Sequence, residues 1–455
     1  MAWYDSAAFY QIYPLGLCGC PHENHGETQN GFAKLTEWAE HARALHCTAL
    51  YLGPLFQSGS HGYDTTDYRL VDTRLGTNAD FAAFVRHCHE IGLRVIVDGV
   101  FNHVGRDFAP FRDVRQNRER SAYCGWFCNL DFGGNNSYGD GFRYANWGGH
   151  DLLVKLNQQN PAVQQYHFDT VRFWAEQFGI DGIRLDAADV LDFGFLHNLR
   201  AFCETLKPDF WLMGEVIHGD YGRWTAPGML HSVTNYALNK GLWSGHNEHN
   251  YFEIAHTVRY VRGLCGDAKL LTFADNHDVA RIASMLQNPQ HLPLVMLLIY
   301  GLPGVPCLYY GSEFGAKAQK QPDSDWNLRP ALALGDFAVD AAAQKLAALA
   351  TRLGALKETL PALSEGDYRE LLLQNRQFAF ARVLGDTAVI FALNCDDAPA
   401  HVELAPPVPA AKVQDLLAGW ETDTTRLPQA GLADGRLKLD LPANTGTVLS
   451  LMVSS

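Results

Sequence analysis

Residues 94–103 read RVIVDGVFNH, a short run of mainly β-branched residues that gives way to polar ones. Such a run is typical of a strand buried in a parallel sheet. Asp98 and His103 stand at its carboxyl end. Apolar runs that end on charged residues recur along the chain, as GIRLD at 182–186 and TFADNHD at 272–278. The recurrence predicts several parallel strands with polar side chains at their carboxyl ends.

Longer amphipathic stretches separate these runs. An alternation of strands and helices implies parallel pairing through right-handed crossovers. We expect strands at residues 8–13, 49–53, 94–100, 182–186, 210–216, 270–274 and 305–310, with a weaker one at 232–238. We expect helices at residues 31–45, 78–91, 161–178 and 195–206. The pattern predicts an α/β protein with a closed (β/α)8 TIM barrel, domain A, built from residues 1–103 and 151–364.

One connection between the predicted strands is unusually long. About 60 residues, rich in glycine, asparagine and aromatic residues, separate the strand that ends near residue 100 from the helix at residue 161. Loops longer than about 15 residues are uncommon and are usually functional. We therefore predict a small inserted domain B at residues 104–150, after the third strand.

The pattern changes after residue 364. Short strand-like runs with glycine, asparagine and proline turns follow at 377–384, 388–393, 400–404, 436–441 and 446–453. Such a series is typical of an antiparallel β-sandwich. We predict a C-terminal domain of this kind, domain C, at residues 365–455.

The composition excludes several kinds of partner. The chain has 455 residues, with 36 lysine and arginine residues against 50 aspartate and glutamate residues, a formal net charge of −14. This charge repels phosphate backbones and anionic lipid, so we expect neither a nucleic-acid nor a membrane partner. The sequence contains no run of 18 apolar residues, and its first residues lack a signal-peptide pattern. We therefore expect a cytoplasmic protein with reduced cysteines.

Charged side chains end four of the predicted barrel strands. They are Asp98 and His103 on the third, Arg184 and Asp186 on the fourth, Glu215 on the fifth, and His277 and Asp278 on the seventh. Each acid alone would more often be a helix cap or a turn residue. Four such ends in order, beside apolar runs where burial of charge is costly, indicate instead a catalytic site at the mouth of the barrel.

Six segments together resemble signatures of the α-amylase family, which is family 13 of the glycoside hydrolases. They are HGYDTTDY at 61–68, DGVFNH at 98–103, GIRLDAAD at 182–189, GEV at 214–216, FADNHD at 273–278 and YYGSEFG at 309–315. The resemblance extends over about residues 8–315. It implies the barrel, the inserted domain after its third strand and the C-terminal sandwich. It also implies a retaining glycosidase with an oligosaccharide substrate.

The resemblance implies roles for three acids. Asp186 is expected to be the nucleophile. Glu215 is expected to be the general acid in the first step and the general base in the second, and Asp278 is expected to bind sugar hydroxyls. A retaining glycosidase needs one ionised and one protonated carboxyl group about 5–5.5 Å apart. Arg184 lies two residues before Asp186 on the same strand face, where its charge favours an ionised nucleophile. The apolar neighbours of Glu215 favour a protonated acid.

Other residues take substrate-binding roles by the same resemblance. His103 and His277 resemble the histidines that bind hydroxyls of the glucose before the scissile bond. Tyr63 resembles the aromatic platform beneath that glucose, with a core tyrosine as the alternative. Asp98 is expected to orient Arg184 without binding sugar.

We expect no required cofactor. Asn102 matches a position that binds calcium in many secreted amylases, but the other oxygen ligands of such a site cannot be assigned. Calcium therefore stays an open alternative that we do not expect to be required. The close cysteine pairs Cys18/Cys20 and Cys124/Cys128 leave a metal site as a second alternative, without the Cys-x2-Cys repeat that would support it.

The segment LLVKLNQQNP at 152–161 is similar to the MPKLN segment of the neopullulanase and cyclomaltodextrinase group. Lys155 at the lysine position points to α-1,4-linked maltodextrins, with an exposed lysine of no special role as the alternative. That group carries an N-terminal β-domain that builds its dimer. We expect no such domain here, because the first barrel strand begins at about residue 8, so a homodimer would use another surface.

Two further features concern the sugar-binding side chains. In the loop QPDSDWNLRP at 321–330, Arg329 is expected to contact sugar beside Asp325, because oligosaccharide-acting relatives place such a pair on the non-reducing side. Tryptophans in predicted loops around the mouth are candidates for stacking on sugars or for ordinary packing. They are Trp126, Trp147, Trp224, Trp243 and Trp326.

The sequence therefore predicts a retaining α-glucoside hydrolase that cleaves α-1,4 bonds in small linear, cyclic or branched maltodextrins, cyclic maltosyl-maltose included. A transglycosylase with the same three acids and an α-1,6-glucosidase are the alternatives. A non-catalytic binding barrel is disfavoured, because members of that kind lose the catalytic acids, and all three acids are present here.

Overall fold

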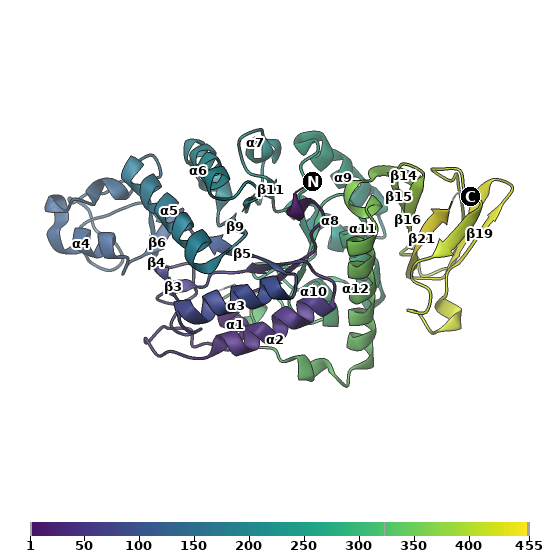
Figure 1. Ribbon diagram of the computed structural model, residues 1–455, viewed down its shortest axis with the longest axis horizontal. Helices are drawn as coiled ribbons and strands as arrows, with labels where there is room; N and C mark the ends of the chain where they lie inside the picture. Colours follow the sequence, from purple (N-terminus) through teal and green to yellow (C-terminus); the bar gives the residue numbers. More distant parts are fainter. Residues whose placement is uncertain (1, 323, 453–455) are drawn as a thin grey trace. The chain divides into compact units, whose positions relative to one another are not determined.

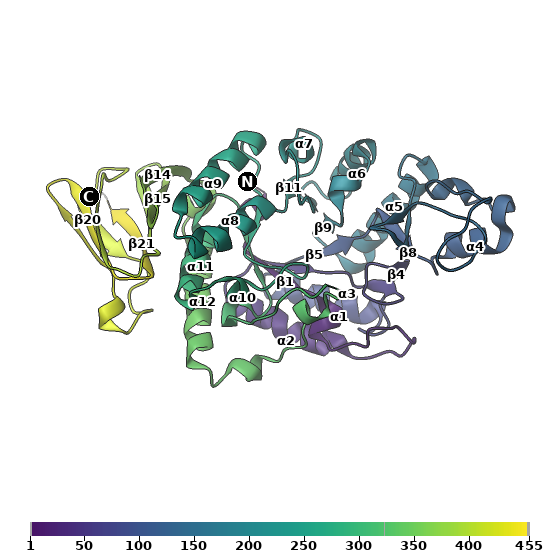
Figure 2. The ribbon, with the colours of Figure 1, turned by 180° about the vertical axis from the view of Figure 1, so that it is seen from behind.

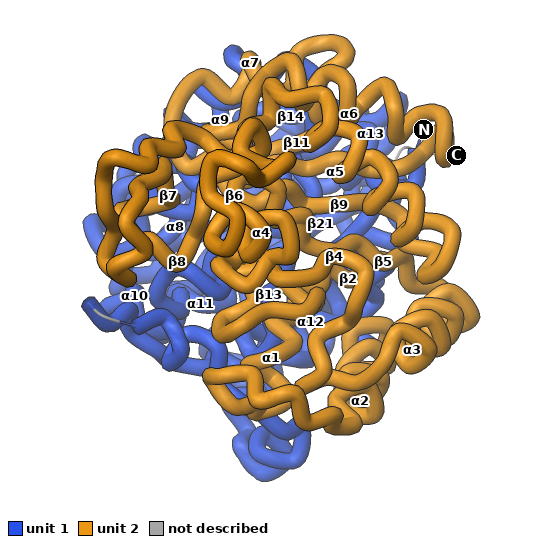
Figure 3. The backbone as a smooth tube through the Cα atoms, turned by 90° about the vertical axis from the view of Figure 1, so that its left-hand side faces the viewer, with its two compact units in different colours: residues 1–11, 44–48, 234–455 blue, residues 12–43, 49–233 orange. Residues whose placement is uncertain are grey.

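The computed structural model describes residues 2–322 and 324–452. The chain divides into two compact units, coloured separately in Figure 3. The first unit comprises residues 1–11, 44–48 and 234–455, and the second comprises residues 12–43 and 49–233. The division differs from the domain boundaries expected from the sequence, which stay a prediction.

Eight parallel strands form one sheet, and some of them are labelled in Figure 1. They are β1 (Phe9–Ile12), β2 (Ala49–Leu52), β5 (Arg94–Gly99), β9 (Gly182–Leu185), β10 (Trp211–Gly214), β11 (Ser232–Val233), β12 (Leu271–Phe273) and β13 (Val305–Tyr309). Their order across the sheet is β11-β10-β9-β5-β2-β1-β13-β12. Thr234, directly after β11, forms a parallel bridge with Leu271 of β12, which links the two ends of the sheet. The predicted (β/α)8 barrel is confirmed.

Helices connect the strands. The α-helices are α1 (Pro14–Leu17), α2 (Gly31–Ala44), α3 (Asn78–Glu90), α4 (Ala109–Asn117), α5 (Pro161–Phe173), α6 (Phe193–Leu206), α7 (Gly222–Thr225), α8 (Tyr236–Asn247), α9 (Tyr251–Cys265), α10 (Ile282–Met285), α11 (Leu292–Gly301), α12 (Ala341–Thr359) and α13 (Ala362–Glu365). Within residues 2–322 and 324–452, no helix has both the length and the apolar character that crossing a bilayer requires.

Side-chain caps fix several helix starts. The Thr77 side chain accepts a hydrogen bond from the Asp80 N–H at the start of α3, and Asn160 accepts one from Ala162 at the start of α5. Asn235 likewise caps α8 by accepting from the Leu238 N–H. The prediction of a strand at 232–238 is therefore wrong in its second half, because the chain turns into a helix at Tyr236.

The segment that follows β5 forms a small antiparallel sheet, which Figure 2 shows beside α4. Its strands are β6 (His103–Gly105), β7 (Asn146–Trp147) and β8 (His150–Lys155), in the order β6-β8-β7. The ring of Phe111 on α4 packs against Phe127, Phe142 and Tyr144. These contacts give the segment an apolar core of its own. A separate hairpin, β3 (Phe56–Ser58) and β4 (Thr65–Val71), precedes it.

The C-terminal residues form two antiparallel sheets. Their strands are β14 (Asp367–Leu373), β15 (Gln377–Leu384), β16 (Thr387–Asn394), β17 (Ala400–Leu404), β18 (Lys412–Asp415), β19 (Gln429–Ala433), β20 (Arg436–Leu441) and β21 (Thr445–Met452). The sheet orders are β14-β15-β16-β21-β18 and β17-β20-β19. Ile390 and Leu449 of one sheet share a core with Leu439 of the other, so the predicted sandwich is confirmed. The last residue of the strand expected at 446–453 lies outside the described residues.

Candidate active site

Arg184 on β9 lies among three acids in the second unit. Its Nη1 is 3.2 Å from Asp98 Oδ1 and 3.1 Å from Asp186 Oδ1, and its Nη2 is 2.9 Å from Glu215 Oε1. Arg184 is 2% exposed. Burial alone would lower the pKa of the guanidinium, but the charges of Asp98 and Glu215 outweigh it and raise the pKa well above its ordinary value. Arg184 therefore stays positively charged between the three carboxyl groups.

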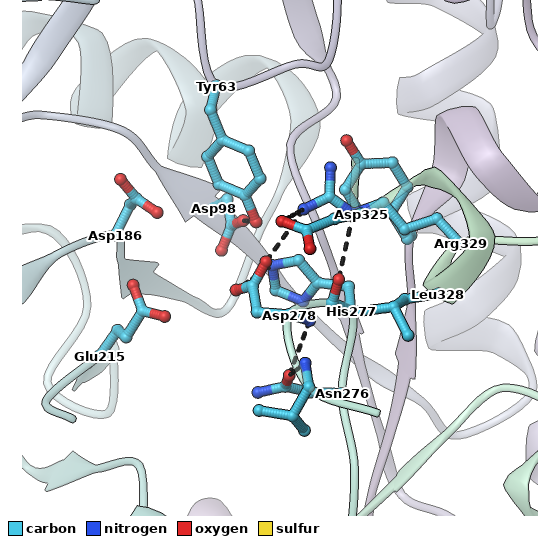
Figure 4. Close-up of polar contacts among 12 residues, drawn as sticks. Tyr63, Asp98, Asp186, Glu215, Asn276, His277, Asp278, Asp325, Leu328 and Arg329 are labelled. Carbon is cyan, nitrogen blue, oxygen red and sulfur yellow. Dashed lines mark hydrogen bonds and ion pairs between the residues drawn. The ribbon is translucent and has the colours of Figure 1, made fainter. Parts of the chain in front are cut away.

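Strand register brings these residues together. Arg184 pairs with Asp98 of β5 on one side and with Met213 of β10 on the other. Asp186 and Glu215 directly follow β9 and β10, and their N–H groups still continue the ladder, to Gly99 O and Leu185 O. The two acids therefore leave neighbouring strands at the same edge of the sheet. Figure 4 shows their carboxyl groups near one another.

The backbone directly after Asp186 has a strained conformation that directs an N–H group at Glu215. Ala187 has φ 46° and ψ 43°, a left-handed conformation that costs a residue with a Cβ about 1–2 kcal/mol. Its N–H donates to Glu215 Oε2 at 2.9 Å. Glu215 is buried, as expected, but its two oxygens face a guanidinium and a backbone N–H. The apolar surroundings expected from its sequence neighbours are therefore only part of its environment.

Asp98 is fixed by two tyrosines as well as by Arg184. Tyr51 O–H donates to Oδ1 at 2.8 Å, and Tyr63 O–H donates to Oδ2 at 3.1 Å. Burial raises the pKa of Tyr51 well above its ordinary value, so Tyr51 remains an O–H donor. Tyr63 is half-buried. Tyr51 is buried, and it is a residue that sequence reasoning missed. The available signal was a hydroxyl group within the buried strand at 49–53.

His103 begins β6 beside two residues of the inserted sheet. The pairing of β6 with β8 places His103 directly opposite Lys155. The Trp147 ring lies almost parallel to the His103 ring, with 6.2 Å between ring centroids and 5° between the planes. Burial, helped by His61, lowers the pKa of His103 to about 3, so its imidazole is neutral. A neutral ring can both donate and accept, which suits a sugar hydroxyl.

A second group of predicted residues comes together in the first unit. Asp278 follows β12, and its Oδ1 is 2.9 Å from Arg329 Nη2, the ion pair drawn in Figure 4. His277 Nε2 is 3.0 Å from Asp278 Oδ2. Arg329 also donates to the His277 carbonyl and lies 3.7 Å from Asp325 Oδ2. Gln11 Nε2 is 2.8 Å from His277 Nδ1, a contact that sequence reasoning missed.

The tryptophans differ in their surroundings. Trp224 is buried on α7 and donates to the Ala188 carbonyl, so it packs within the fold. Trp243 lies within α8 and not in the expected loop. Trp126 contacts the rings of Phe108, Tyr123 and Tyr166 in a short 3-10 turn (Cys124–Trp126). Trp147 lies beside His103, a predicted substrate-binding residue.

The positions that the sequence offered as metal ligands do not form a metal-binding group in the described residues. In the described part of the chain, no three or more His, Cys, Asp or Glu side chains group so as to hold a metal ion. The cysteines of both close pairs are free thiols. Asn102 Oδ1 is buried without a hydrogen-bond partner. The expectation that calcium is not required stays a prediction.

The chain has similarities to known proteins along most of its length. Residues 11–345 match the family described as "Alpha amylase, catalytic domain". Neopullulanase 2 of Thermoactinomyces vulgaris is 30% identical, in an alignment that covers 98% of this chain and 78% of that protein. The intracellular maltogenic amylase of Bacillus subtilis strain 168 is 27% identical, with 88% of this chain and 70% of that protein covered.

Among solved structures, the acarbose-soaked debranching enzyme of Nostoc punctiforme superimposes with a TM-score of 0.84. It is 26% identical, and 98% of each chain is covered. Its likeness and the family match agree with the barrel. The chain belongs to the α-amylase family and is a glycoside hydrolase.

Proposed function

We propose that this chain is a retaining hydrolase that cleaves α-1,4-glucosidic bonds in small linear, cyclic or branched maltodextrins. One observation carries the proposal: Asp186 and Glu215, two buried acids that directly follow neighbouring strands, contact the two terminal nitrogens of one guanidinium. A retaining glycosidase needs such a close pair of carboxyl groups, one for nucleophilic attack and one for proton transfer.

In the first step, the Asp186 carboxylate attacks the anomeric carbon, and the bond from that carbon to the glycosidic oxygen breaks. Glu215 gives its proton to the departing oxygen, so the leaving sugar is released with a hydroxyl group and a β-linked glucosyl ester remains. In the second step, the Glu215 carboxylate takes a proton from water, whose oxygen attacks the same carbon and releases Asp186. Two inversions restore the α configuration.

Asp278 is proposed to bind hydroxyls of the glucose before the scissile bond, together with His277 and Arg329. The contacts from His277 Nε2 and Arg329 Nη2 fix both Asp278 oxygens, which supports this role. Tyr63 and His103 are proposed to contact the same glucose. Positive charge that develops on the ring in the transition state is stabilised by carboxylates that are already in place.

Lys155 is proposed to select among glucans. Its position directly opposite His103 supports a place near bound sugar, and the relatives named neopullulanase and maltogenic amylase agree with maltodextrin as the substrate class. The name of the Bacillus subtilis relative also supports a cytoplasmic location. The homodimer stays a prediction.

A substrate panel with product sizing tests the proposal. It compares maltotriose, cyclodextrins, pullulan, panose and isomaltose, and it follows the configuration of the first product by proton NMR. The α-anomer from maltotriose or a cyclodextrin is the expected first product. Release of the β-anomer would exclude the covalent mechanism, and products longer than maltotriose at low concentration would favour the transglycosylase.

An α-1,6 activity is the second candidate. The similarity to the solved debranching enzyme of Nostoc punctiforme is the observation that favours it. Panose contains one bond of each linkage, so the first product pair separates the two candidates. Hydrolysis of the α-1,6 bond releases maltose and glucose. If this reaction is faster than hydrolysis of the α-1,4 bond, the α-1,6 activity replaces the main proposal.

A further inference from the structure

Arg281 is a buried arginine that the mechanism above does not use. Its side chain is 1% exposed, and it lies three residues after Asp278. Nη1 donates to the Tyr310 carbonyl at 2.8 Å and to Ser312 Oγ at 3.2 Å. The guanidinium carbon is 4.0 Å from the centre of the Tyr309 ring. The charge is therefore held by oxygens and by an aromatic face.

The same guanidinium reaches the loop that carries Arg329. Nη2 donates to the Leu328 carbonyl at 3.5 Å, and Tyr309 O–H donates to that carbonyl at 3.0 Å. Tyr310 O–H donates to the Pro330 carbonyl at 2.7 Å. Arg329 is thus flanked by two residues whose carbonyls are bound from the end of β13.

Arg281 is also connected to the loop that carries Asp278. Ser312 Oγ, its hydrogen-bond partner, donates to Asp275 Oδ1 at 2.6 Å. Asp275 Oδ2 in turn accepts from the Ile282 N–H at 2.8 Å. Asp275 therefore joins the two ends of the loop from Asp275 to Ile282, and Ser312 connects that loop to the residues after β13.

We propose that Arg281 is a positioning residue that sets the Asp278–Arg329 ion pair for binding glucose on the non-reducing side of the scissile bond. The inference rests on the proposed function, because it assumes that this ion pair binds sugar. The planar guanidinium supplies donors in two directions, whereas a lysine ammonium is a single point charge. Lysine at position 281 therefore cannot hold both loops.

A double-mutant cycle tests the inference. Arg281→Met, Arg329→Met and the double variant are compared by kcat and KM on maltotriose, with thermal midpoints measured alongside. Each single variant is expected to lose tenfold or more in kcat/KM, mainly through KM. The double variant is expected to be no more than about threefold worse than Arg329→Met, because both changes disable the same ion pair.

Three comparisons make each outcome decisive. If Arg329→Met keeps normal kcat/KM, the proposed sugar-binding role of Arg329 is wrong. If Arg329→Met is impaired while Arg281→Met is normal, or if the two losses multiply in the double variant, the positioning role of Arg281 is wrong. Arg281→Lys, expected to be impaired as well, takes the place of Arg281→Met in the cycle should the methionine variant not fold.

Arg382 provides the matched control. It is another buried arginine of the first unit, on β15, and it donates to the carbonyls of Gly301 and Leu302 at the end of α11 and to that of Gly366 before β14. Arg382→Met is expected to lower the thermal midpoint while kcat/KM stays within twofold of the unchanged protein. A loss of kcat/KM in Arg382→Met equal to that in Arg281→Met would mean that the effect is general destabilisation.

Discussion

Replacing Arg184 with methionine removes a positive charge that lies 2.9–3.2 Å from oxygens of three buried acids. At about 4 Å between charge centres and an effective dielectric constant of about 20, each attraction is worth about 4 kcal/mol. Desolvation offsets much of this energy. For a carboxylate, loss of an opposite charge at this range changes its titration by about 1–3 pH units.

The direction follows from the proposed mechanism. Asp186 must be ionised to attack, and the positive charge of Arg184, 3.1 Å from its carboxylate, favours that ionised form. The acid limb of kcat/KM against pH is therefore expected to move up by about 1–3 pH units, since this profile reports the free enzyme. Uncompensated buried carboxylates also destabilise the fold at neutral pH, by about 3–5 kcal/mol.

The assay is kcat/KM on maltotriose between pH 4 and pH 8, with circular dichroism to establish that each variant is folded. Arg184→Lys keeps a positive charge but lacks the two-pronged guanidinium, and it is expected to shift the acid limb of the kcat/KM profile less than Arg184→Met does. Arg382→Met, which removes a buried arginine that donates to backbone carbonyls, is expected to leave the limb in place. A folded Arg184→Met with an unmoved acid limb would refute the reasoning.

Three other predictions can be checked independently. Asp186→Asn and Glu215→Gln are each expected to lower kcat on maltotriose by three orders of magnitude or more, about 4 kcal/mol, with unchanged thermal midpoints. α-Maltosyl fluoride, whose leaving group needs no proton, is expected to restore ester formation in Glu215→Gln alone, detected by mass spectrometry. Lys155→Met is expected to change the ratio of kcat/KM for maltotriose and panose at least fivefold, and an unchanged ratio would make it an ordinary surface lysine. Burial would raise the pKa of Asp181, but interactions led by a hydrogen bond from His89 lower it to about 2. This carboxylate therefore contributes about 2 kcal/mol above pH 4 that is lost as the pH falls through about 2, so Asp181→Asn should be less stable in urea at pH 7 and equally stable near pH 1.

The barrel was predictable because its strands are buried on both faces. β5 and β13 carry almost unbroken runs of buried residues, and such runs are visible in a sequence. β14, β18 and β19 were not predicted, because most of their residues are exposed or half-buried and no continuous apolar run marks them. A strand that lies at the edge of a sheet depends on its neighbours more than on its own residues.

The acids of the site were predictable for a related reason. Asp186 and Glu215 end apolar runs, so their place at one edge of the sheet follows from parallel pairing. The contacts that orient them were not. Tyr51 reaches Asp98 across the β2–β5 register, and the N–H of Ala187 reaches Glu215 through a left-handed backbone that alanine does not favour. Register and strain of this kind arise from the fold as a whole.

The antiparallel pairing of β6 with β8 has a consequence for how this protein diversifies. Three successive residue pairs, from His103 with Lys155 to Gly105 with Leu153, hold the start and the end of the intervening 47-residue segment side by side. Lengthening a closed loop costs only about 0.6 kcal/mol per doubling. Evolution or a designer can therefore replace the segment between β6 and β8 while His103 and Lys155 stay paired.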